Sequence, residues 1–275
     1  MKKMLITGAS GFLGSRAARY FEKTYTLCTP THQEMDITDP AAVDRVMDDF
    51  KPDVVLHCAA MADTGRCQRE PELSWDRNVN GSICVARAAA RVGAKCLLCS
   101  SDQVYFAVPS NIYAHEKLKA EEEGLRVNPD SVFLRLTWMY DPALESTAQR
   151  SDFFTNLLPK LTTQETVSYA VHDRRGITDV NEVIANMEKA ISLPGGVYDF
   201  GSPNDKTMHE TVAAVFSGLG LDPARVKENA DAFKDSPRDI TVNQDVIRRY
   251  GISFADTTDA LVRNFARKLH VSANV

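Results

Sequence analysis

Residues 7–14 read Thr7-Gly8-Ala9-Ser10-Gly11-Phe12-Leu13-Gly14 and follow a short apolar run at residues 3–7. Glycines at 8, 11 and 14 form G-x-x-G-x-x-G, a variant of the dinucleotide-binding fingerprint between a strand and a helix. One glycine permits the tight turn, the next lets the backbone approach a pyrophosphate, and the last lets the helix pack on the strand. The helix N-terminus then offers free N–H groups to phosphates. A simple tight turn is the alternative, but the position after an N-terminal strand favours a nucleotide-binding loop.

Short apolar runs alternate with amphipathic stretches through the first half of the chain. Residues 43, 46, 47 and 50 place Val, Val, Met and Phe on one helical face. An alanine-rich stretch at 74–92 predicts a helix that ends at Gly93. Apolar strands between such helices predict an α/β fold, a Rossmann doubly wound parallel sheet covered on both faces. The strands are expected at 3–7, 25–28, 53–58, 95–101 and 131–136.

The composition changes after residue 140. Residues 141–152 are polar and turn-rich, which predicts a loop, and shorter elements follow. These are a helix at 152–161, a strand at 166–172, a helix at 180–192 and a strand at 196–200. We therefore expect a Rossmann domain at 1–140 and a smaller C-terminal α/β substrate-binding domain at 141–275, with 180–202 returning to the main sheet.

Charge and hydropathy exclude several classes of partner. The chain has 275 residues and a formal net charge of -5, whereas nucleic acids and anionic membranes select basic surfaces. No apolar stretch approaches the roughly 18 residues of a membrane span, and the N-terminal run is too short for a signal peptide. These features predict a cytoplasmic protein without nucleic-acid or membrane partners.

The six cysteines include a C-x-x-C at Cys96 and Cys99. This motif occurs in metal and redox sites, but here it lies in a predicted strand. Residues three apart on a strand point to opposite faces, so the two thiols should not converge. Zinc spacing would also require a second pair of ligands. We expect core cysteines and no metal.

The end of the second strand bears on the choice of nicotinamide cofactor. It is followed by Thr29-Pro30-Thr31-His32, with no carboxylate before Glu34. An NAD-preferring site usually places an acidic residue here to bind the ribose 2′-OH. NADP is therefore favoured and NAD stays open, with Arg16 or His32 available to a 2′-phosphate.

Tyr113-Ala114-His115-Glu116-Lys117 is a Y-x-x-x-K in a helix-forming stretch. Residues i and i+4 share a helix face, so the phenol and the ammonium can lie side by side. Lowering a phenol pKa from ~10 to ~7 needs roughly 4 kcal/mol, which the lysine and a cationic nicotinamide could supply. Ser101 ends a predicted strand, where it could bind a substrate carbonyl or merely cap a turn. An exposed helix pair is the alternative for Tyr113 and Lys117.

The glycine turn, the strand-end serine and Y-x-x-x-K, in this order, resemble the extended short-chain dehydrogenase/reductase family. Cys58-Ala59-Ala60, placed after the fourth strand, is similar to the family's Asn/Cys-Ala-Ala segment, and Asn78-Val79-Asn80-Gly81 is similar to its Asn-Val-x-Gly helix. Within this family the likeness is greatest to the dTDP-4-dehydrorhamnose reductases. It rests on Met35-Asp36-Ile37-Thr38-Asp39-Pro40, Lys51-Pro52-Asp53-Val54-Val55, Ser100-Ser101-Asp102-Gln103-Val104-Tyr105, Arg135-Leu136-Thr137-Trp138-Met139-Tyr140 and Ser236-Pro237-Arg238-Asp239.

The resemblance implies hydride reduction of a 4-keto nucleotide sugar. Ser101 would bind the substrate oxygen, Tyr113 would protonate it, and Lys117 would tune Tyr113 and hold the nicotinamide ribose. Substrate contacts are expected from Ser101, Asp102, Trp138 and Arg175, although Trp138 could equally be packed core and Arg175 solvated surface. The residues expected at the cofactor are Gly8, Ser10, Gly11, Phe12, Leu13, Gly14, Thr31, His32, Asp36, Ile37, Cys58, Ala59, Ala60, Met61, Asn78, Tyr113 and Lys117. Among them, Asp36 and Ile37 would touch the adenine, unless Asp36 caps a turn.

Two departures from the family bear on the substrate. Only eleven residues separate Ser101 from Tyr113, about half the usual number, so part of the substrate wall is missing and Tyr113 could lie further from the sugar. Asp102-Gln103 lacks the second carboxylate that a sugar dehydratase needs as acid or base. The leading function is thus a 4-keto nucleotide-sugar reductase. A reductase or epimerase of another small carbonyl, and a catalytically silent cofactor-binding regulatory protein, stay open. So does the oligomeric state, for which a homodimer is considered.

Overall fold

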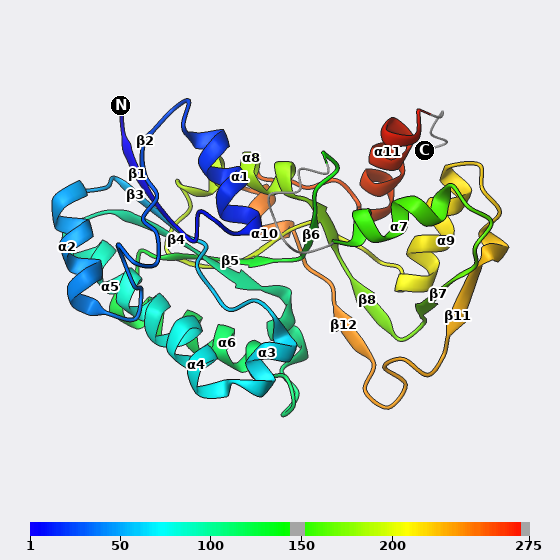
Figure 1. The fold of residues 1–275 in the computed structure, drawn as a ribbon, viewed down its shortest axis with the longest axis horizontal. Coiled ribbons are helices and arrows are strands. Elements are labelled where there is room, and N and C mark those ends of the chain that lie inside the picture. The colour runs from blue at the N-terminus through cyan, green and yellow to red at the C-terminus, as the bar shows by residue number, and fades with distance from the viewer. Residues whose placement is uncertain (144–151, 271–275) are drawn as a thin grey trace. The chain divides into compact units, whose positions relative to one another are not determined.

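The computed structural model describes residues 1–143 and 152–270. Most of the loop expected at 141–152 therefore lies outside the described residues. The chain divides into two compact units, each described here by itself (Figure 1). The first unit comprises Met1–Arg135, Ile184–Tyr198 and Tyr250–Ile252, and the second comprises Leu136–Val183, Asp199–Arg249 and Ser253–Val275.

The described elements follow one another in an alternating order up to residue 136. They are β1 (Lys3–Thr7), α1 (Phe12–Phe21), β2 (Thr26–Cys28), α2 (Pro40–Phe50), β3 (Val54–His57), α3 (Thr64–Arg69), α4 (Pro71–Trp75), η1 (Asp76–Asn80), α5 (Gly81–Val92), β4 (Lys95–Ser101), η2 (Asp102–Phe106), α6 (Ile112–Val127) and β5 (Val132–Leu136). Shorter elements follow: β6 (Trp138–Tyr140), α7 (Phe153–Leu161), β7 (Val167–Ala170), β8 (Asp173–Arg175), β9 (Ile177–Asp179), α8 (Val180–Ala190), β10 (Gly196–Phe200), α9 (Met208–Gly218), η3 (Pro223–Arg225), β11 (Val226–Asn229), β12 (Arg238–Ile240), α10 (Asp245–Arg248) and α11 (Thr257–Leu269).

The main sheet has six parallel strands in the order β10-β5-β4-β3-β1-β2. From β1 the chain moves outward to β2 on one side and then to β3, β4 and β5 on the other. Ligands of such sheets bind beyond the carboxyl ends of the strands where the order reverses, which here lies between β1 and β3. The predicted α/β doubly wound fold is confirmed, and 196–200 forms the edge strand β10.

Side chains of the sheet alternate between two layers of helices. Leu5 packs with apolar residues of α2 and α5, whereas the preceding Met4 packs with Phe21 of α1 and Met187 of α8. Figure 1 shows α1 and α8 on one side of the sheet and α2, α5 and α6 on the other. Both faces are therefore covered, which accounts for strands that are apolar almost throughout.

Two expectations about elements need correction. The strand before Cys58 is the third along the chain rather than the fourth, because residues 29–39 form turns and irregular backbone. The helix predicted at 74–92 is interrupted by the π-helical turn η1 between α4 and α5. Its end is as predicted, since Gly93 caps α5 with a φ of +72°. Such π turns often occur at functional sites.

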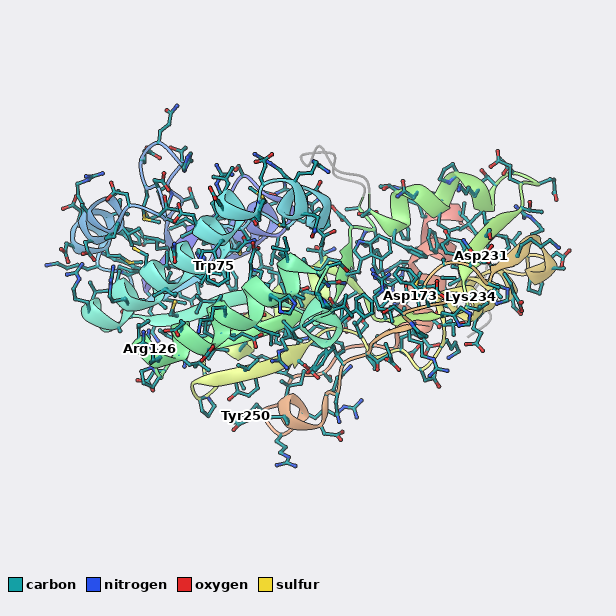
Figure 2. The ribbon with its side chains drawn as sticks, turned by 90° about the horizontal axis from the view of Figure 1, so that it is seen from below. Trp75, Arg126, Asp173, Asp231, Lys234 and Tyr250 are labelled. Carbon is teal, nitrogen blue, oxygen red and sulfur yellow. The ribbon has the colours of Figure 1, made fainter. Side chains whose placement is uncertain are left out.

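The second unit contains three pairs of short parallel strands, β6–β9, β7–β11 and β8–β12. Its apolar core joins α7, α9 and α11 around the stacked rings of Phe154 and Phe265, whose centroids lie 4.0 Å apart. Figure 2 labels Asp173 of β8 within this unit, and Trp75 and Tyr250 among the exposed aromatic side chains of the first. Among the described residues, no helix is long and apolar enough to cross a membrane.

Candidate active site

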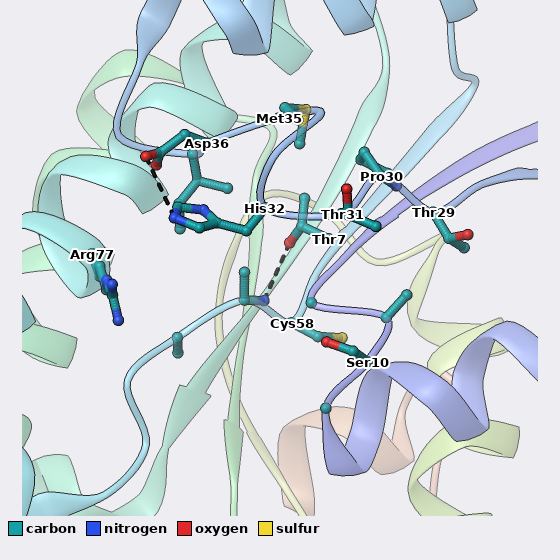
Figure 3. Close-up of a pocket in the computed structure, with 16 residues that line it drawn as sticks. Thr7, Ser10, Thr29, Pro30, Thr31, His32, Met35, Asp36, Cys58 and Arg77 are labelled. Carbon is teal, nitrogen blue, oxygen red and sulfur yellow. Dashed lines mark hydrogen bonds and ion pairs between the residues drawn. The ribbon is translucent and has the colours of Figure 1, made fainter. Parts of the chain in front are cut away.

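A pocket of about 670 Å³ lies at the carboxyl ends of β1 and β3, where the strand order reverses (Figure 3). This volume falls in the range of roughly 300–1,000 Å³ that small-molecule and cofactor sites occupy. All of its walls belong to the first unit. They are formed by Thr7, Gly8, Ala9, Ser10, Gly11, Thr29, Pro30, Thr31, His32, Met35, Asp36, Ile37, Cys58, Ala59, Ala60 and Arg77.

The glycine turn brings β1, α1 and the segment after β3 into close contact. Gly8 has a φ of +67°, and a Cβ there would lie 2.7 Å from the backbone N of Ala59. A Cβ on Gly14 would collide with the carbonyl oxygen of Gly8. Gly11 is the N-cap of α1, whose first turn holds no acidic residue. The turn from Gly8 to Gly11 lines the pocket, and the positive end of the α1 dipole starts there, which fits a phosphate.

Ten of the residues expected at the cofactor line the pocket: Gly8, Ser10, Gly11, Thr31, His32, Asp36, Ile37, Cys58, Ala59 and Ala60. The other wall residues were not among those expected at the cofactor; they are Thr7, Ala9, Thr29, Pro30, Met35 and Arg77. Most of these lie beside predicted positions along the chain. Arg77 directly precedes Asn78, on the π-helical turn η1, which the sequence did not predict.

The remaining expected cofactor residues, Phe12, Leu13, Gly14, Met61, Asn78, Tyr113 and Lys117, do not line this pocket. Leu13 is buried on the inner face of α1. Phe12 lies beneath the guanidinium of Arg16, 4.2 Å from the ring centroid. Arg16, considered for a 2′-phosphate, is buried and donates to the Phe12 carbonyl at 2.8 Å. Its side chain is therefore turned toward its own helix.

Asn78 is fully buried and joins three segments of the first unit. Its side-chain oxygen accepts from Met61 N at 2.8 Å, and its amide nitrogen donates to Met61 O at 3.0 Å and to Glu116 Oε2 at 2.7 Å. Ser74 donates to the other oxygen of Glu116. Asn78 thus fixes the segment after β3 against α6, and its expected contact with the cofactor stays a prediction.

Charges of both signs gather where β2 ends. His32 Nε2 lies 3.7 Å from Asp36 Oδ2, and Figure 3 shows Arg77 on the same side of the pocket. Glu34 folds back to accept from the backbone N–H of Thr31 at 2.8 Å and from its hydroxyl at 2.9 Å. These hydrogen bonds lower the pKa of Glu34. A carboxylate thus reaches the end of β2 although none occurs there in the sequence.

Ser101, Tyr113 and Lys117 converge in the first unit. Asn111 caps α6 by accepting from its backbone at 3.2 Å, and its side chain donates to Phe106 O at 2.9 Å. The short segment after Ser101 thereby brings Tyr113 into the first turn of α6, close enough to Ser101 and Asp102 for both to influence its pKa. Lys117 Nζ lies 5.6 Å from the centre of the Tyr113 ring. The shortened segment has not separated these side chains.

Burial raises the pKa of the Tyr113 phenol and the nearby Asp102 carboxylate raises it further, while the hydrogen bond of Ser101 lowers it. The sequence analysis expected a lowered value. The Lys117 ammonium donates to the carbonyl of Cys99 at 2.8 Å, and burial lowers the pKa of Lys117. A phenol with a raised pKa stays protonated at neutral pH, so Tyr113 keeps its proton in the resting protein.

Of the two roles considered for Ser101, the structure shows the turn cap, and the contact with a substrate carbonyl stays a prediction. Its hydroxyl accepts from Gln103 N at 3.2 Å, so it caps η2, and it donates to Asp102 Oδ1 at 3.2 Å. The same hydroxyl contacts the phenol of Tyr113. The cap therefore fixes the hydroxyl beside the phenol at the carboxyl end of β4.

Trp138 and Arg175 lie together in the second unit. The Trp138 side chain is 39% exposed and contacts the ring of Phe153 edge-on, with centroids 5.6 Å apart. The guanidinium of Arg175 lies over the indole, 5.3 Å from its centroid. The Arg175 side chain is only 11% exposed and lies 3.3 Å from Asp173. Trp138 is therefore not a packed core residue, and Arg175 is not a solvated surface residue.

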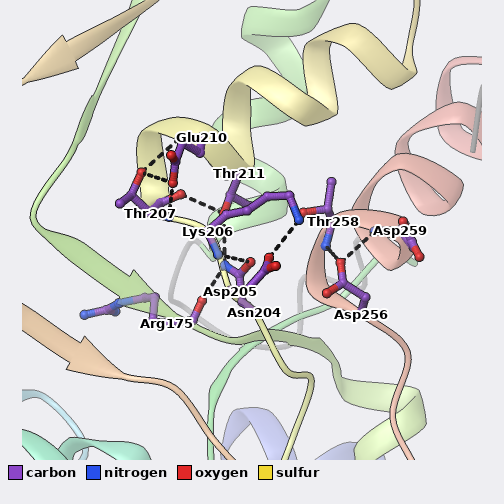
Figure 4. Close-up of polar contacts among 10 residues, drawn as sticks. All are labelled: Arg175, Asn204, Asp205, Lys206, Thr207, Glu210, Thr211, Asp256, Thr258 and Asp259. Atoms are coloured by element: carbon purple, nitrogen blue, oxygen red, sulfur yellow. Dashed lines mark hydrogen bonds and ion pairs between the residues drawn. The ribbon is translucent and has the colours of Figure 1, made fainter.

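Asp173 also binds Arg238, which donates to its two oxygens at 2.7 and 2.6 Å. The backbone of β8 is held in addition by Asn204, which donates to the carbonyl of Arg175 at 2.9 Å and to Thr211 at 2.9 Å (Figure 4). The position of Arg175 is therefore set by both its side chain and its main chain.

Cys96 and Cys99 do not converge, as expected. Cys96 packs against α2 and α5, whereas Cys99 contacts Cys58, with 3.8 Å between the sulfur atoms. This second pairing depends on β3 and β4 being neighbours, which the sequence did not show. Across residues 1–143 and 152–270, no group of three His, Cys, Asp or Glu side chains is placed to hold a metal.

Comparison with known proteins agrees with this architecture. The family described as RmlD substrate binding domain matches residues 1–239. A dTDP-4-dehydrorhamnose reductase of Mycobacterium tuberculosis (strain CDC 1551 / Oshkosh) is 27% identical over 252 residues, covering 84% of this chain and 80% of that protein. The methionine adenosyltransferase 2 subunit beta of Xenopus laevis is 28% identical over 256 residues, with coverages of 84% and 76%.

A solved structure of dTDP-4-dehydrorhamnose reductase from Bacillus anthracis, in complex with NADP, superposes with a TM-score of 0.82 at 21% identity. It covers 98% of this chain and 100% of that one, which supports the fold. The resemblance drawn from the sequence is confirmed. Because the family match spans most of the sequence, the chain belongs to the RmlD substrate binding domain family.

Proposed function

We propose that this chain is an NAD(P)H-dependent reductase of a 4-keto nucleotide sugar, with Tyr113 as its proton donor. The observation that carries the proposal is the convergence of Ser101, Tyr113 and Lys117 at the carboxyl end of β4, where the Lys117 ammonium donates to the carbonyl of Cys99 and lies 5.6 Å from the centre of the Tyr113 ring. All three residues belong to the same unit as the glycine-lined pocket. The nicotinamide would supply the hydride to the ketone carbon.

The side chains have distinct tasks in this reaction. Ser101 donates a hydrogen bond to the substrate carbonyl oxygen, and Tyr113 gives it a proton as negative charge develops. The raised pKa of Tyr113 keeps that proton in place until the oxygen becomes basic. The phenolate that remains is stabilised by Ser101 and by the positive charge of Lys117, 5.6 Å from the ring centre.

The proposed cofactor is NADP, with NAD open. The glycine turn and the helix start fit the pyrophosphate of either. The Arg77 guanidinium and the His32 imidazole lie in the pocket wall and would suit a 2′-phosphate, whereas Asp36 and Glu34 place carboxylates close by. The Bacillus anthracis relative, whose structure holds NADP, supports the choice.

The proposed substrate contacts are Ser101 and Asp102 in the first unit and Trp138 and Arg175 in the second. Asp102 is buried and raises the pKa of Tyr113, so it lies close to the phenol. Trp138 offers an exposed aromatic face, and Arg175 a guanidinium held in place by Asp173. Aromatic and guanidinium groups suit the base and the diphosphate of a nucleotide sugar.

A second candidate function is a cofactor-binding regulatory protein. The similarity to the methionine adenosyltransferase subunit of Xenopus laevis favours it. The intact contact between Tyr113 and Ser101 favours the reductase, since a protein without turnover has no need of a proton donor.

Purified protein mixed with NADPH or NADH and a panel of 4-keto nucleotide sugars separates the two functions. Substrate-dependent loss of nicotinamide absorbance supports the reductase, and the nucleotide sugar that gives the highest kcat/KM identifies the substrate class. Tight cofactor binding without turnover of any carbonyl compound would support the regulatory protein. Failure to bind either cofactor would contradict both.

A further inference from the structure

Cys58 and Cys99 form a pair of thiols beside the candidate cofactor pocket. Cys58 follows β3 and lines the pocket, and Cys99 lies on the neighbouring strand β4. Their sulfur atoms are 3.8 Å apart, and both residues are half-buried. Neither thiol takes part in the proton transfer proposed above, so their proximity calls for a separate explanation.

The strand register allows a covalent bond between these sulfurs. His57 pairs with Leu98 in the parallel ladder of β3 and β4, so Cys58 and Cys99 are the next two partners along it. Neighbouring strands lie about 4.8 Å apart, inside the range of roughly 4.4–6.8 Å between Cα atoms that a disulfide spans. Side-chain rotation alone can therefore bring the sulfurs to bonding distance. Cys96, on the opposite face of β4, has no such access to Cys58.

The surroundings also activate one thiol of the pair, Cys99, while its partner Cys58 has a raised pKa because of the hydrogen bond with Cys99 and burial. The hydrogen bond with Cys58 lowers the pKa of the Cys99 thiol, and the positive charge of Lys117 lowers it further. Lys117 is held at this place because its ammonium donates to the Cys99 carbonyl at 2.8 Å. The thiolate is the reactive form of cysteine. The site thus offers one sulfur nucleophile and a second sulfur within reach of it.

We propose that Cys58 and Cys99 are a site of covalent modification, at which a hydroperoxide oxidises the two thiols to a disulfide. One thiolate attacks hydrogen peroxide, the O–O bond breaks, and the leaving oxygen takes the proton that the thiol lost on ionising, so a sulfenic acid and water form. The second thiolate attacks this sulfur, the S–S bond forms, the S–O bond breaks, and a second water leaves. The thiols lose two electrons and two protons, and the peroxide accepts them.

The modification has a consequence for the pocket that rests on the proposed function. Cys58 is part of the pocket wall and Lys117 is bonded to the Cys99 carbonyl. Drawing the sulfurs together displaces both groups. We therefore expect the oxidised protein to bind NADPH at least tenfold more weakly, and dithiothreitol to restore the affinity.

The test uses the purified full chain, oxidised with hydrogen peroxide, blocked with N-ethylmaleimide and digested with trypsin. Cys58 falls in the tryptic peptide 46–66, and Cys96 and Cys99 share the peptide 96–117. A disulfide joining these two peptides is expected in the wild type and in Cys96→Ser, the matched control on the same strand. It should be absent from Cys99→Ser.

Cysteines that stay free, or Cys58 oxidised beyond the sulfenic acid without a cross-link, would overturn the proposal. So would a cross-link that persists in Cys99→Ser. If a variant does not fold, fragmentation of the cross-linked wild-type peptides between Cys96 and Cys99 shows which of the two is bonded to Cys58. Because the cross-link is measured by mass and needs no cofactor, its failure is distinguishable from failure of the proposed reductase. Slower cross-linking in saturating NADPH would in addition support the cofactor pocket.

Discussion

Replacing Gly8 by alanine should destabilise the protein and weaken cofactor binding together. Gly8 has a φ of +67°, and its Cβ would lie 2.7 Å from Ala59 N and 2.8 Å from Ala59 Cα. A left-handed backbone costs a residue with a Cβ about 1–2 kcal/mol. The added methyl also meets main-chain atoms, which cannot rotate away, so overpacking adds about 1–3 kcal/mol. We expect a total of about 2–5 kcal/mol.

Gly93→Ala is the matched control. Gly93 has a φ of +72°, close to that of Gly8, but a Cβ there meets no atom within 4 Å. It should therefore show the backbone cost alone, about 1–2 kcal/mol, and it lies at the far end of α5 from the pocket. The difference in the free energy of unfolding between the two variants measures the contact of β1 with the segment after β3.

Differential scanning calorimetry and NADPH titration followed by fluorescence measure the two effects. At roughly 2–4 °C per kcal/mol, Gly8→Ala should lower the Tm by about 4–20 °C and Gly93→Ala by about 2–8 °C. Only Gly8→Ala should weaken NADPH binding, because it displaces the pocket wall at Ala59. Equal Tm changes in the two variants, with NADPH affinity retained in both, would refute the reasoning.

Three further predictions concern charge and buried polar groups. Burial lowers the pKa of His57 to about 3 from its ordinary 6.5. As the pH falls, the unfolded chain therefore binds a proton at His57 before the folded protein does, and the wild type should lose about 2 kcal/mol of stability between pH 7 and pH 5. The His57→Gln variant should lose less stability over this range, measured as the shift of the urea midpoint. The same pH dependence in the variant and the wild type would contradict this prediction. Asn78→Ala removes the side chain that bonds Glu116 and the Met61 backbone. It should therefore lower the free energy of unfolding by about 2–4 kcal/mol. An unchanged urea midpoint would argue against the positioning role of Asn78. Arg77→Ala should weaken NADPH binding about tenfold, or ~1.4 kcal/mol, and change NADH binding little. An equal loss of affinity for NADPH and NADH would place Arg77 away from the 2′-phosphate.

The fold was predictable because its signals are local. The apolar run before Gly8, the glycine spacing and the alternation of strands and helices each lie in one short stretch, and the six-stranded parallel sheet confirms what they indicated. The same holds for Tyr113 and Lys117, since a spacing of four on a helix places two side chains on one face whatever the tertiary structure.

The parts that were missed depend on tertiary structure. Arg77 reaches the pocket through a π-helical turn, which helix periodicity does not reveal. The raised pKa of Tyr113 depends on burial, and the contact between Cys58 and Cys99 depends on which strands are neighbours. Asn78 matched a family motif, but its partners are Met61 and Glu116. A motif predicts position along an element more reliably than it predicts the partners of a buried side chain.

The most direct test of the proposed chemistry removes one oxygen atom. Tyr113→Phe keeps the ring that packs beside Met61 and Cys67 but deletes the hydroxyl that contacts Ser101. With NADPH and the best 4-keto nucleotide sugar of the panel, kcat should fall about 10²–10⁴-fold, the usual contribution of a general acid. The Kd for NADPH should stay within about twofold of wild type, or ~0.4 kcal/mol. A variant that turns over within a few-fold of the wild-type rate would contradict Tyr113 as the proton donor.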